Sequence, residues 1–137
     1  MTVQQDLLVT ALLLACGTAQ ASDWVSVAEN KELTTELFVD VSSIRVTDNI
    51  RRMWTKLQYK SHTKDDKNKW VDHDISRSAY NCAEELTRLE SLIIYYEDGD
   101  SDTLPMDPIP DPWMPVPPDT LRWVELEFVC AWSKETS

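Results

Sequence analysis

Two histidines could act as a general base near neutral pH, and both stand in or beside a charged stretch. His62 lies within this stretch, and Asp72 and Asp74 flank His73. Strand alternation would put both aspartates on the face opposite His73, so one metal ion could not take all three side chains. No Gly-rich nucleophile elbow and no serine or cysteine pattern surrounds either histidine. We therefore expect solvated histidines, no catalytic residue and no bound metal, with a metal-dependent hydrolase as the last-ranked alternative.

A second acidic motif, "DGDSD", places Asp98, Asp100 and Asp102 around a glycine. The alternating carboxylates resemble the start of a calcium-binding loop. The loop lacks the glycine at its sixth position and the glutamate at its twelfth that such sites use. We expect a plain acidic turn, with a weak calcium contact as the alternative and no cofactor.

The N-terminal segment predicts export. Leu7–Ala15 is apolar apart from one threonine and is shorter than the roughly 20 residues that a transmembrane helix needs. Ala19-Gln20-Ala21 is a small-x-small cleavage motif, so residues 1–21 are predicted to be a signal peptide. Cys16 is a candidate lipidation site, because a small residue precedes it, although the leucine before that fits a lipoprotein signal poorly. The sequence leaves two cleavage sites open, one before Cys16 and one after Ala21. We expect contact with a membrane only through a lipid on Cys16.

Export leaves two cysteines, Cys82 and Cys130, in the predicted mature chain. In an oxidising compartment two such cysteines most often form a disulfide, and two buried thiols are the alternative. The chain has no CxxC motif, which argues against a redox-active dithiol.

The charge of the chain is strongly acidic but uneven. Its formal net charge is −11, which argues against binding to nucleic acid or to an anionic membrane surface. Most basic residues nevertheless lie between Arg45 and Arg88, and the segment Arg51–Lys60 is the most basic strand candidate. A ligand face is predicted there, and the alternative is an ordinary solvated face guarded by lysines. Its residues are Arg51, Arg52, Trp54, Lys56 and Lys60.

The elements that would position this face are mostly strands. Five segments predict β-strands: Trp24–Val27, Glu36–Val41, Arg51–Lys60, Asp74–Asn81 and Arg88–Asp98. The last is the most apolar, so we expect it to be central, and we expect Ser61–Lys69 to be a polar hairpin loop. In Arg51–Lys60, alternation places Met53, Leu57 and Tyr59 on one face and Arg52, Trp54, Lys56, Gln58 and Lys60 on the other.

The C-terminal part predicts an extended segment followed by a helix. Pro105–Pro118 holds all seven prolines and should be extended, with Trp113 fixing it to the domain. The last segment fits both helical and strand spacing, and we favour a helix with Asp119 or Thr120 as its N-cap. The expected fold class is α+β, with residues 22–137 forming one domain: a single antiparallel sheet of five to six strands and a C-terminal helix packed against it.

A set of short motifs then resembles one known family, the surface-adhesin protein E family of bacterial exported proteins. The motifs occur in the family's order: "WVSV" at Trp24, "FVDVSSI" at Phe38–Ile44, "MW" and "QYK" within 53–60, "YNCAEELTR" at Tyr80–Arg88, "YYEDG" at Tyr95–Gly99 and "WMPVPPDT" at Trp113–Thr120, followed by Cys130. The family's usual Pro-Gly-Ser before the last helix is Pro118-Asp119-Thr120 in this sequence.

The resemblance implies a curved, half-open sheet with a helix against it and a disulfide between Cys82 and Cys130. It implies a location in the periplasm or at the outer membrane and cell surface. The family's named member is a lipoprotein that can form dimers, so the resemblance also implies a possible lipid anchor and homodimer. It also implies binding of host matrix and serum proteins such as laminin, vitronectin and plasminogen. We therefore interpret the chain as a non-enzymatic, adhesin-like envelope protein that binds other macromolecules. A periplasmic structural or stress-related protein without a host ligand is the alternative.

Overall fold

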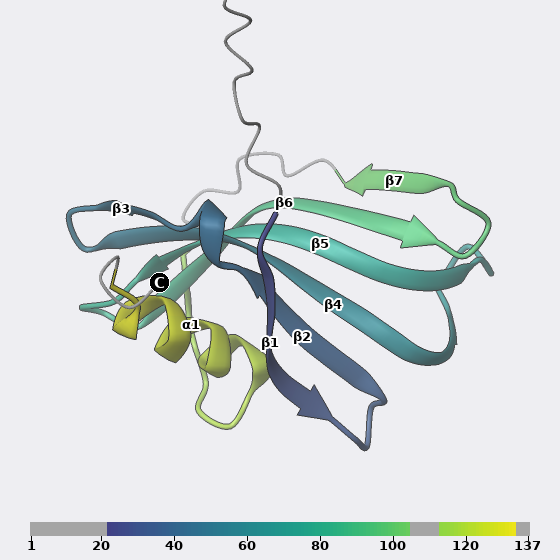
Figure 1. The fold of residues 1–137 in the computed structure, drawn as a ribbon, viewed down its shortest axis with the longest axis horizontal. Coiled ribbons are helices and arrows are strands. Elements are labelled where there is room, and N and C mark those ends of the chain that lie inside the picture. Colours follow the sequence, from purple (N-terminus) through teal and green to yellow (C-terminus); the bar gives the residue numbers. More distant parts are fainter. Residues whose placement is uncertain (1–21, 105–112, 134–137) are drawn as a thin grey trace, which may run out of the picture.

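The computed structural model describes residues 22–104 and 113–133 (Figure 1). The predicted signal peptide with Cys16, and residues 105–112 of the proline-rich segment, lie outside this part. The described elements are β1 (Trp24–Asn30), β2 (Thr35–Asp40), η1 (Val41–Ser43), β3 (Arg45–Thr47), β4 (Ile50–Lys64), β5 (Trp70–Asn81), β6 (Leu86–Tyr96), β7 (Ser101–Leu104), β8 (Met114–Pro115) and α1 (Leu121–Ala131). In this part of the chain no helix is long and apolar enough to cross a membrane.

The strands form one antiparallel sheet that does not close into a barrel. Its main order is β1-β2-β4-β5-β6-β7, while β3 pairs with β4 and β8 pairs with β6. The predicted antiparallel sheet with a C-terminal helix is confirmed, but the count of five to six strands is wrong, because the sheet has eight. β6 is not central as predicted: β4 and β5 are, and β7 lies outside β6.

Three strands that the sequence does not reveal, β3, β7 and β8, are short and solvent-exposed. The side chains of β3 are all exposed, and β7 and β8 span only four and two residues with mostly exposed side chains. Such segments have no buried face, and therefore no apolar alternation to detect. β3 forms through a tight hairpin with β4 in which Asp48 adopts a positive φ of 53°.

The hairpin between β4 and β5 is also longer than predicted. β4 continues to Lys64 and β5 begins at Trp70, so the predicted loop Ser61–Lys69 is half strand. The ring of Trp70 explains the extension, since the Lys64 ammonium lies 4.5 Å from its centroid and the His62 ring meets it edge-on, also at 4.5 Å. Cross-strand contacts with one aromatic side chain thus hold a polar sequence in strand form.

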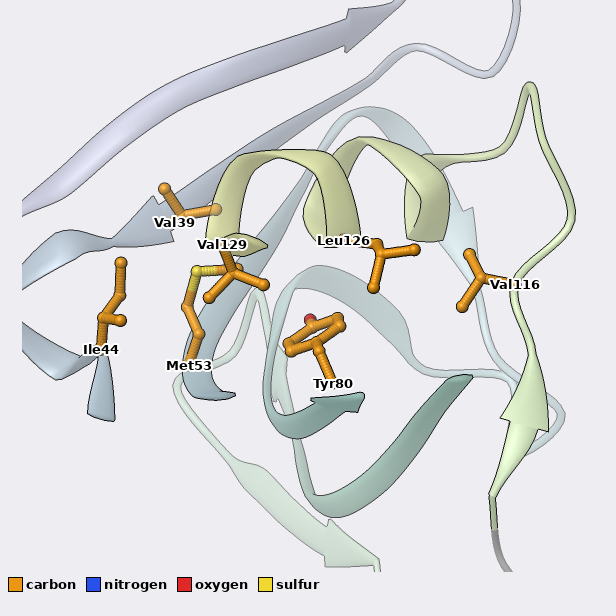
Figure 2. Packing of buried hydrophobic residues seen from close by; sticks show 7 residues of the cluster. All are labelled: Val39, Ile44, Met53, Tyr80, Val116, Leu126 and Val129. Carbon is orange, nitrogen blue, oxygen red and sulfur yellow. The ribbon is translucent and has the colours of Figure 1, made fainter. Parts of the chain in front are cut away.

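The core lies between α1 and one face of the sheet, which we call the inner face. Figure 2 shows side chains from β2, β4, β5 and α1 converging there. The cluster consists of Val39, Ile44, Met53, Tyr80, Val116, Leu126 and Val129. Because side chains alternate along a strand, the neighbours of these residues point to the opposite, outer face. The far ends of β4, β5 and β6 extend beyond α1 in Figure 1.

Both ends of α1 are attached by specific contacts. At its start Thr120 is the N-cap, and its hydroxyl accepts a hydrogen bond from the backbone N–H of Trp123 at 3.2 Å. At its end Cys130 is bonded to Cys82, which directly follows β5, with 5.7 Å between the two Cα atoms. The helix, the Thr120 cap and the disulfide are therefore confirmed, and together they fix which face of the sheet is covered.

Candidate binding face

The outer face of the sheet carries four of the five residues that the sequence predicts as a ligand face. Met53 and Thr55 are buried on the inner face, so Arg52, Trp54 and Lys56 point outward from β4. The register places Phe38 and Ile75 on either side of Lys56, and Ile93 beyond Ile75. A row of aromatic and aliphatic side chains therefore crosses the middle strands, with a cation inside it.

The charge of Lys56 is held between two aromatic rings. Its ammonium lies 5.0 Å from the centroid of the Trp24 ring and 4.8 Å from that of Phe38. Within the described residues it makes no ion pair and no hydrogen bond. Cation–π contacts hold the ammonium in place without neutralising it. Lys56 therefore presents a positioned positive charge.

A second cation without a carboxylate partner lies on the neighbouring strand. Arg77 is exposed on β5 and stands directly opposite Trp54 in the register. In the part of the chain that the structure describes, its guanidinium makes no ion pair or hydrogen bond. Arg77 was not among the predicted ligand residues, because its strand offered no basic pattern. Only the register, which places it beside Trp54, reveals it.

Arg52 is on the same face but is already paired. Its Nε lies 2.9 Å from Oε1 of Glu90, and Arg88 approaches the other oxygen of this carboxylate at 3.3 Å. The guanidinium of Arg88 also stacks over the ring of Trp113, 4.8 Å from its centroid. This contact agrees with the predicted role of Trp113 in fixing the segment that leads to α1. Arg52 therefore lies at the edge of the face, and its positive charge is neutralised by Glu90.

Lys60 is paired as well, at the other end of the face. Its ammonium lies 2.6 Å from Glu29 and 3.4 Å from Glu36. The pKa of Glu36 is lowered, first because the Ser26 hydroxyl donates to it and also because of Lys60. The pKa of Lys60 is raised by its hydrogen bonds to Glu29 and Glu36. Acidic groups thus border the two free cations.

Arg51 does not belong to this face. It points to the inner face, where its Nη1 donates to the carbonyls of Val129 and Trp132, both at 2.6 Å. These carbonyls are at the C-terminal end of α1, where helical acceptors lack intrahelical partners and the helix dipole favours a cation. The grouping of Arg51 with Arg52 was therefore wrong, and its role is to hold the helix.

The side chains of His73 and Asp72 meet, although strand alternation predicts them on opposite faces of the sheet. Nδ1 of His73 is 2.5 Å from Oδ2 of Asp72, and its ring stacks on Tyr95 at 4.6 Å. The two side chains meet because the register shifts between Val71 and His73, which breaks the alternation at Asp72. Asp74 lies on the inner face and accepts a hydrogen bond from Tyr59.

The carboxylates of the acidic turn after β6 form ion pairs with lysines. The ammonium of Lys69 lies 3.7 Å from Asp98 and 3.3 Å from Asp100, and Lys67 lies 3.1 Å from Asp102. Within residues 22–104 and 113–133, no group of three His, Cys, Asp or Glu side chains could hold a metal ion. The described carboxylates of this turn therefore act as partners of the neighbouring β4–β5 hairpin.

The inner face holds a buried polar cluster beneath α1. Arg122 donates to the hydroxyl of Ser78 at 2.9 Å and to Glu125 at 3.3 Å, and Glu125 is only 4% exposed. Burial raises the pKa of Glu125, against the opposing effect of Arg122. Burial also raises the pKa of Asp74, against the hydrogen bond from Tyr59 and the charge of Arg122. This cluster links the helix to the sheet.

The raised pKa of Asp74 predicts a pH-dependent stability. Because the folded state disfavours the ionised carboxylate, its contribution to the free energy of unfolding is favourable below the unfolded pKa and is lost as pH rises through the folded pKa. Asp74→Asn should therefore be more stable than the wild type at neutral pH. The difference should disappear at about pH 3, below the ordinary aspartate pKa of about 3.9. Urea unfolding across pH measures it.

Asp65→Asn is the control, and its expected effect on stability at neutral pH is opposite to that of Asp74→Asn. The pKa of Asp65 is lowered, first by a hydrogen bond from the Lys69 backbone and then by those from Tyr96 and the Lys67 backbone. This variant should be less stable than the wild type at neutral pH, and the deficit should shrink as pH falls through the folded pKa of Asp65. Parallel pH profiles for Asp74→Asn and Asp65→Asn would contradict the assignment.

The family model and the solved structures that match this chain both concern protein E. A family model described as surface-adhesin protein E matches residues 24–131. Crystal form II of Haemophilus influenzae protein E is similar with a TM-score of 0.58 at 17% identity, covering 86% of this chain and 94% of that chain. A further structure of Haemophilus influenzae protein E has a TM-score of 0.57 at 17% identity, covering 86% and 91%. No curated protein sequence matches the chain.

At this identity the likeness to solved structures shows a shared fold only. The family match, however, extends from the first residue of β1 to the last residue of α1. The family is one of surface adhesins, not of enzymes. This chain therefore belongs to the surface-adhesin protein E family.

Proposed function

We propose that this chain is an exported, non-enzymatic adhesin that binds another protein through the outer face of its sheet. Lys56 and Arg77 carry the proposal, because they are two neighbouring cations without carboxylate partners among the described residues. Trp54 and Phe38 lie beside them. Aromatic side chains and arginine are the residue types enriched at the energetic centres of protein interfaces.

The covered inner face supports the same choice of surface. Helix α1 packs on the inner face and is held there by the Cys82–Cys130 bond, so the outer face is the side of the sheet on which no described helix packs. Host matrix and serum proteins such as laminin and vitronectin are the proposed ligands, on the strength of the family. Export through residues 1–21 and presentation at the cell surface belong to the proposal, with Cys16 as the candidate anchor.

Removing both free cations should weaken adhesion. The double variant Lys56→Ala with Arg77→Ala is expected to bind immobilised vitronectin or laminin about tenfold more weakly than the wild type, a loss of about 1.4 kcal/mol. The measurement is biolayer interferometry on the protein isolated after export, with circular dichroism to confirm that the variant is folded.

The matched control is Lys31→Ala with Lys64→Ala. Both lysines are exposed, and Lys64 also lies over an aromatic ring, so the control removes the same charge and a similar cation–π contact away from the middle of the face. Binding should stay within about twofold of the wild type. The proposed function is refuted if both double variants lose equal affinity, or if the wild type binds neither matrix protein.

A further inference from the structure

The inner face of the sheet carries a half-buried row of side chains where the strands extend past α1 (Figure 1). Thr55 and Ser76, which lie opposite each other on this face, are only 2% and 7% exposed. The next row along the strands consists of Leu57 on β4, Asp74 on β5 and Ile94 on β6, which are direct partners in the register. The side chains of this row are all half-buried. Asp74 therefore stands between two aliphatic side chains, on a part of the inner face that is still partly open to solvent.

The carboxylate of Asp74 has one free oxygen and no ion pair among the described residues. Its Oδ2 accepts a hydrogen bond from the Tyr59 hydroxyl at 2.9 Å, whereas its Oδ1 accepts none from the described part of the chain. The charge of Arg122 acts on Asp74. The guanidinium itself, however, donates to Ser78 and Glu125. A carboxylate in partly apolar surroundings is stabilised by a paired cation, and the described fold supplies none to Oδ1.

We propose that this row binds a lysine side chain of a partner protein, with the ammonium on Oδ1 of Asp74 and the methylene stem along Leu57 and Ile94. The lysine ammonium is a compact charge on a flexible stem of four carbons, so one acceptor oxygen and an apolar surface suit it. An arginine binds a carboxylate best through both oxygens, and the Tyr59 hydroxyl already occupies one of them. The formal net charge of −11 also favours a cationic segment.

The energetics of Asp74 fit a binding role. Burial raises the pKa of this carboxyl, while the hydrogen bond from Tyr59 and the charges of Arg122 and His73 act the other way. The ionised side chain therefore costs stability in the folded chain without a ligand, and a bound ammonium would offset that cost. Groups whose charged form is disfavoured by their surroundings are concentrated at functional sites. Asparagine at this position should thus favour folding and weaken binding, which separates the two effects.

The test is an NMR titration of the protein isolated after export with three end-capped amino acids: lysine, norleucine and arginine. Capped lysine should shift the amide signals of Leu57, Asp74 and Ile94. It should bind about fivefold more tightly than the other two, since norleucine lacks the charge and arginine lacks the second free oxygen. Asp74→Asn should weaken the binding of capped lysine about fivefold. Tyr59→Phe should narrow the preference for lysine over arginine, because it frees Oδ2 of Asp74.

Asp48→Asn is the matched control, because it removes the same charge at a distance from the row. Asp48 is exposed in the turn between β3 and β4, and asparagine tolerates its positive φ of 53°. Capped lysine should bind this variant as it binds the wild type.

Four results overturn the inference: equal losses in the two asparagine variants, unchanged affinity in Asp74→Asn, equal affinities for capped lysine and norleucine, or tighter binding of capped arginine by the wild type. Tighter binding of butylamine than of capped lysine also overturns it, in favour of a free amine as the occupant. The row lies on the face opposite Lys56 and Arg77, so this second site does not depend on the proposed function. Loss of vitronectin binding in the outer-face double variant and loss of lysine binding in Asp74→Asn are therefore separate results.

Discussion

Replacing Cys82 and Cys130 together with alanine is expected to lower the free energy of unfolding by about 4 kcal/mol. The two residues are 48 positions apart, and a cross-link over a loop of that length removes much of the freedom of the unfolded chain. In the folded state the bond ties the last turn of α1 to the end of β5. Urea unfolding followed by tryptophan fluorescence measures the change.

Chemical reduction of the wild type supplies the matching control. Excess reductant should bring the wild type to the same midpoint as the double variant and should leave the variant unchanged. Because typical domains have a stability of only about 5–15 kcal/mol, this loss is a large share of the total. A drop below about 1 kcal/mol would contradict the role given to the bond, since packing and the contacts of Arg51 and Arg122 would then hold α1 without it.

Arg51→Ala is expected to cost about 3 kcal/mol of stability, the second largest effect. The substitution removes the two hydrogen bonds from Nη1 to the carbonyls of Val129 and Trp132. Hydrogen bonds to charged groups contribute about 1.5–3 kcal/mol each, and exposure of the helix end to water restores part of that. Urea unfolding at neutral pH, with the disulfide intact, gives the value.

Arg77→Ala is the paired comparison, because it removes the same side chain from the opposite face of the sheet. Arg77 is exposed and without a partner among the described residues, so its removal should change stability by less than about 0.5 kcal/mol. The two variants should also differ in their affinity for matrix protein. Arg51→Ala should bind matrix protein like the wild type at temperatures where it is folded, whereas Arg77→Ala should not. Equal stability losses would remove the distinction between a structural and a binding arginine.

The two arginines also show what the sequence could and could not reveal. Alternation in β4 places Arg51 on the same side as Met53, so the pattern itself assigns Arg51 to the inner face. Counting basic residues along one segment obscured that signal. Arg77 and Phe38 belong to other strands, and only the pairing of β4 with β2 and β5 brings them beside Lys56. Register between strands is set by the whole fold and cannot be obtained from one segment.

The fold was predictable where a face is buried. β2, β4 and β5 alternate because one side of each meets the core, and α1 follows a clear cap at Thr120. The short strands β3, β7 and β8 bury little, so they left no pattern. The contact between Asp72 and His73 depends on a register shift that no local rule signals. The cysteine pair was predictable because Cys16 falls within the predicted signal peptide, which leaves Cys82 and Cys130 as the expected partners.

Acetylation of lysines in the native protein, with and without bound vitronectin, tests the outer face most directly, because no residue is changed. Lys56 and Lys64 both lie over aromatic rings, but only Lys56 is in the middle of the face. Mass spectrometry should show acetylation of Lys56 falling several-fold on binding, while that of Lys31 and Lys64 stays the same. Unchanged labelling of Lys56, with protection of lysines elsewhere, would contradict adhesion through the outer face.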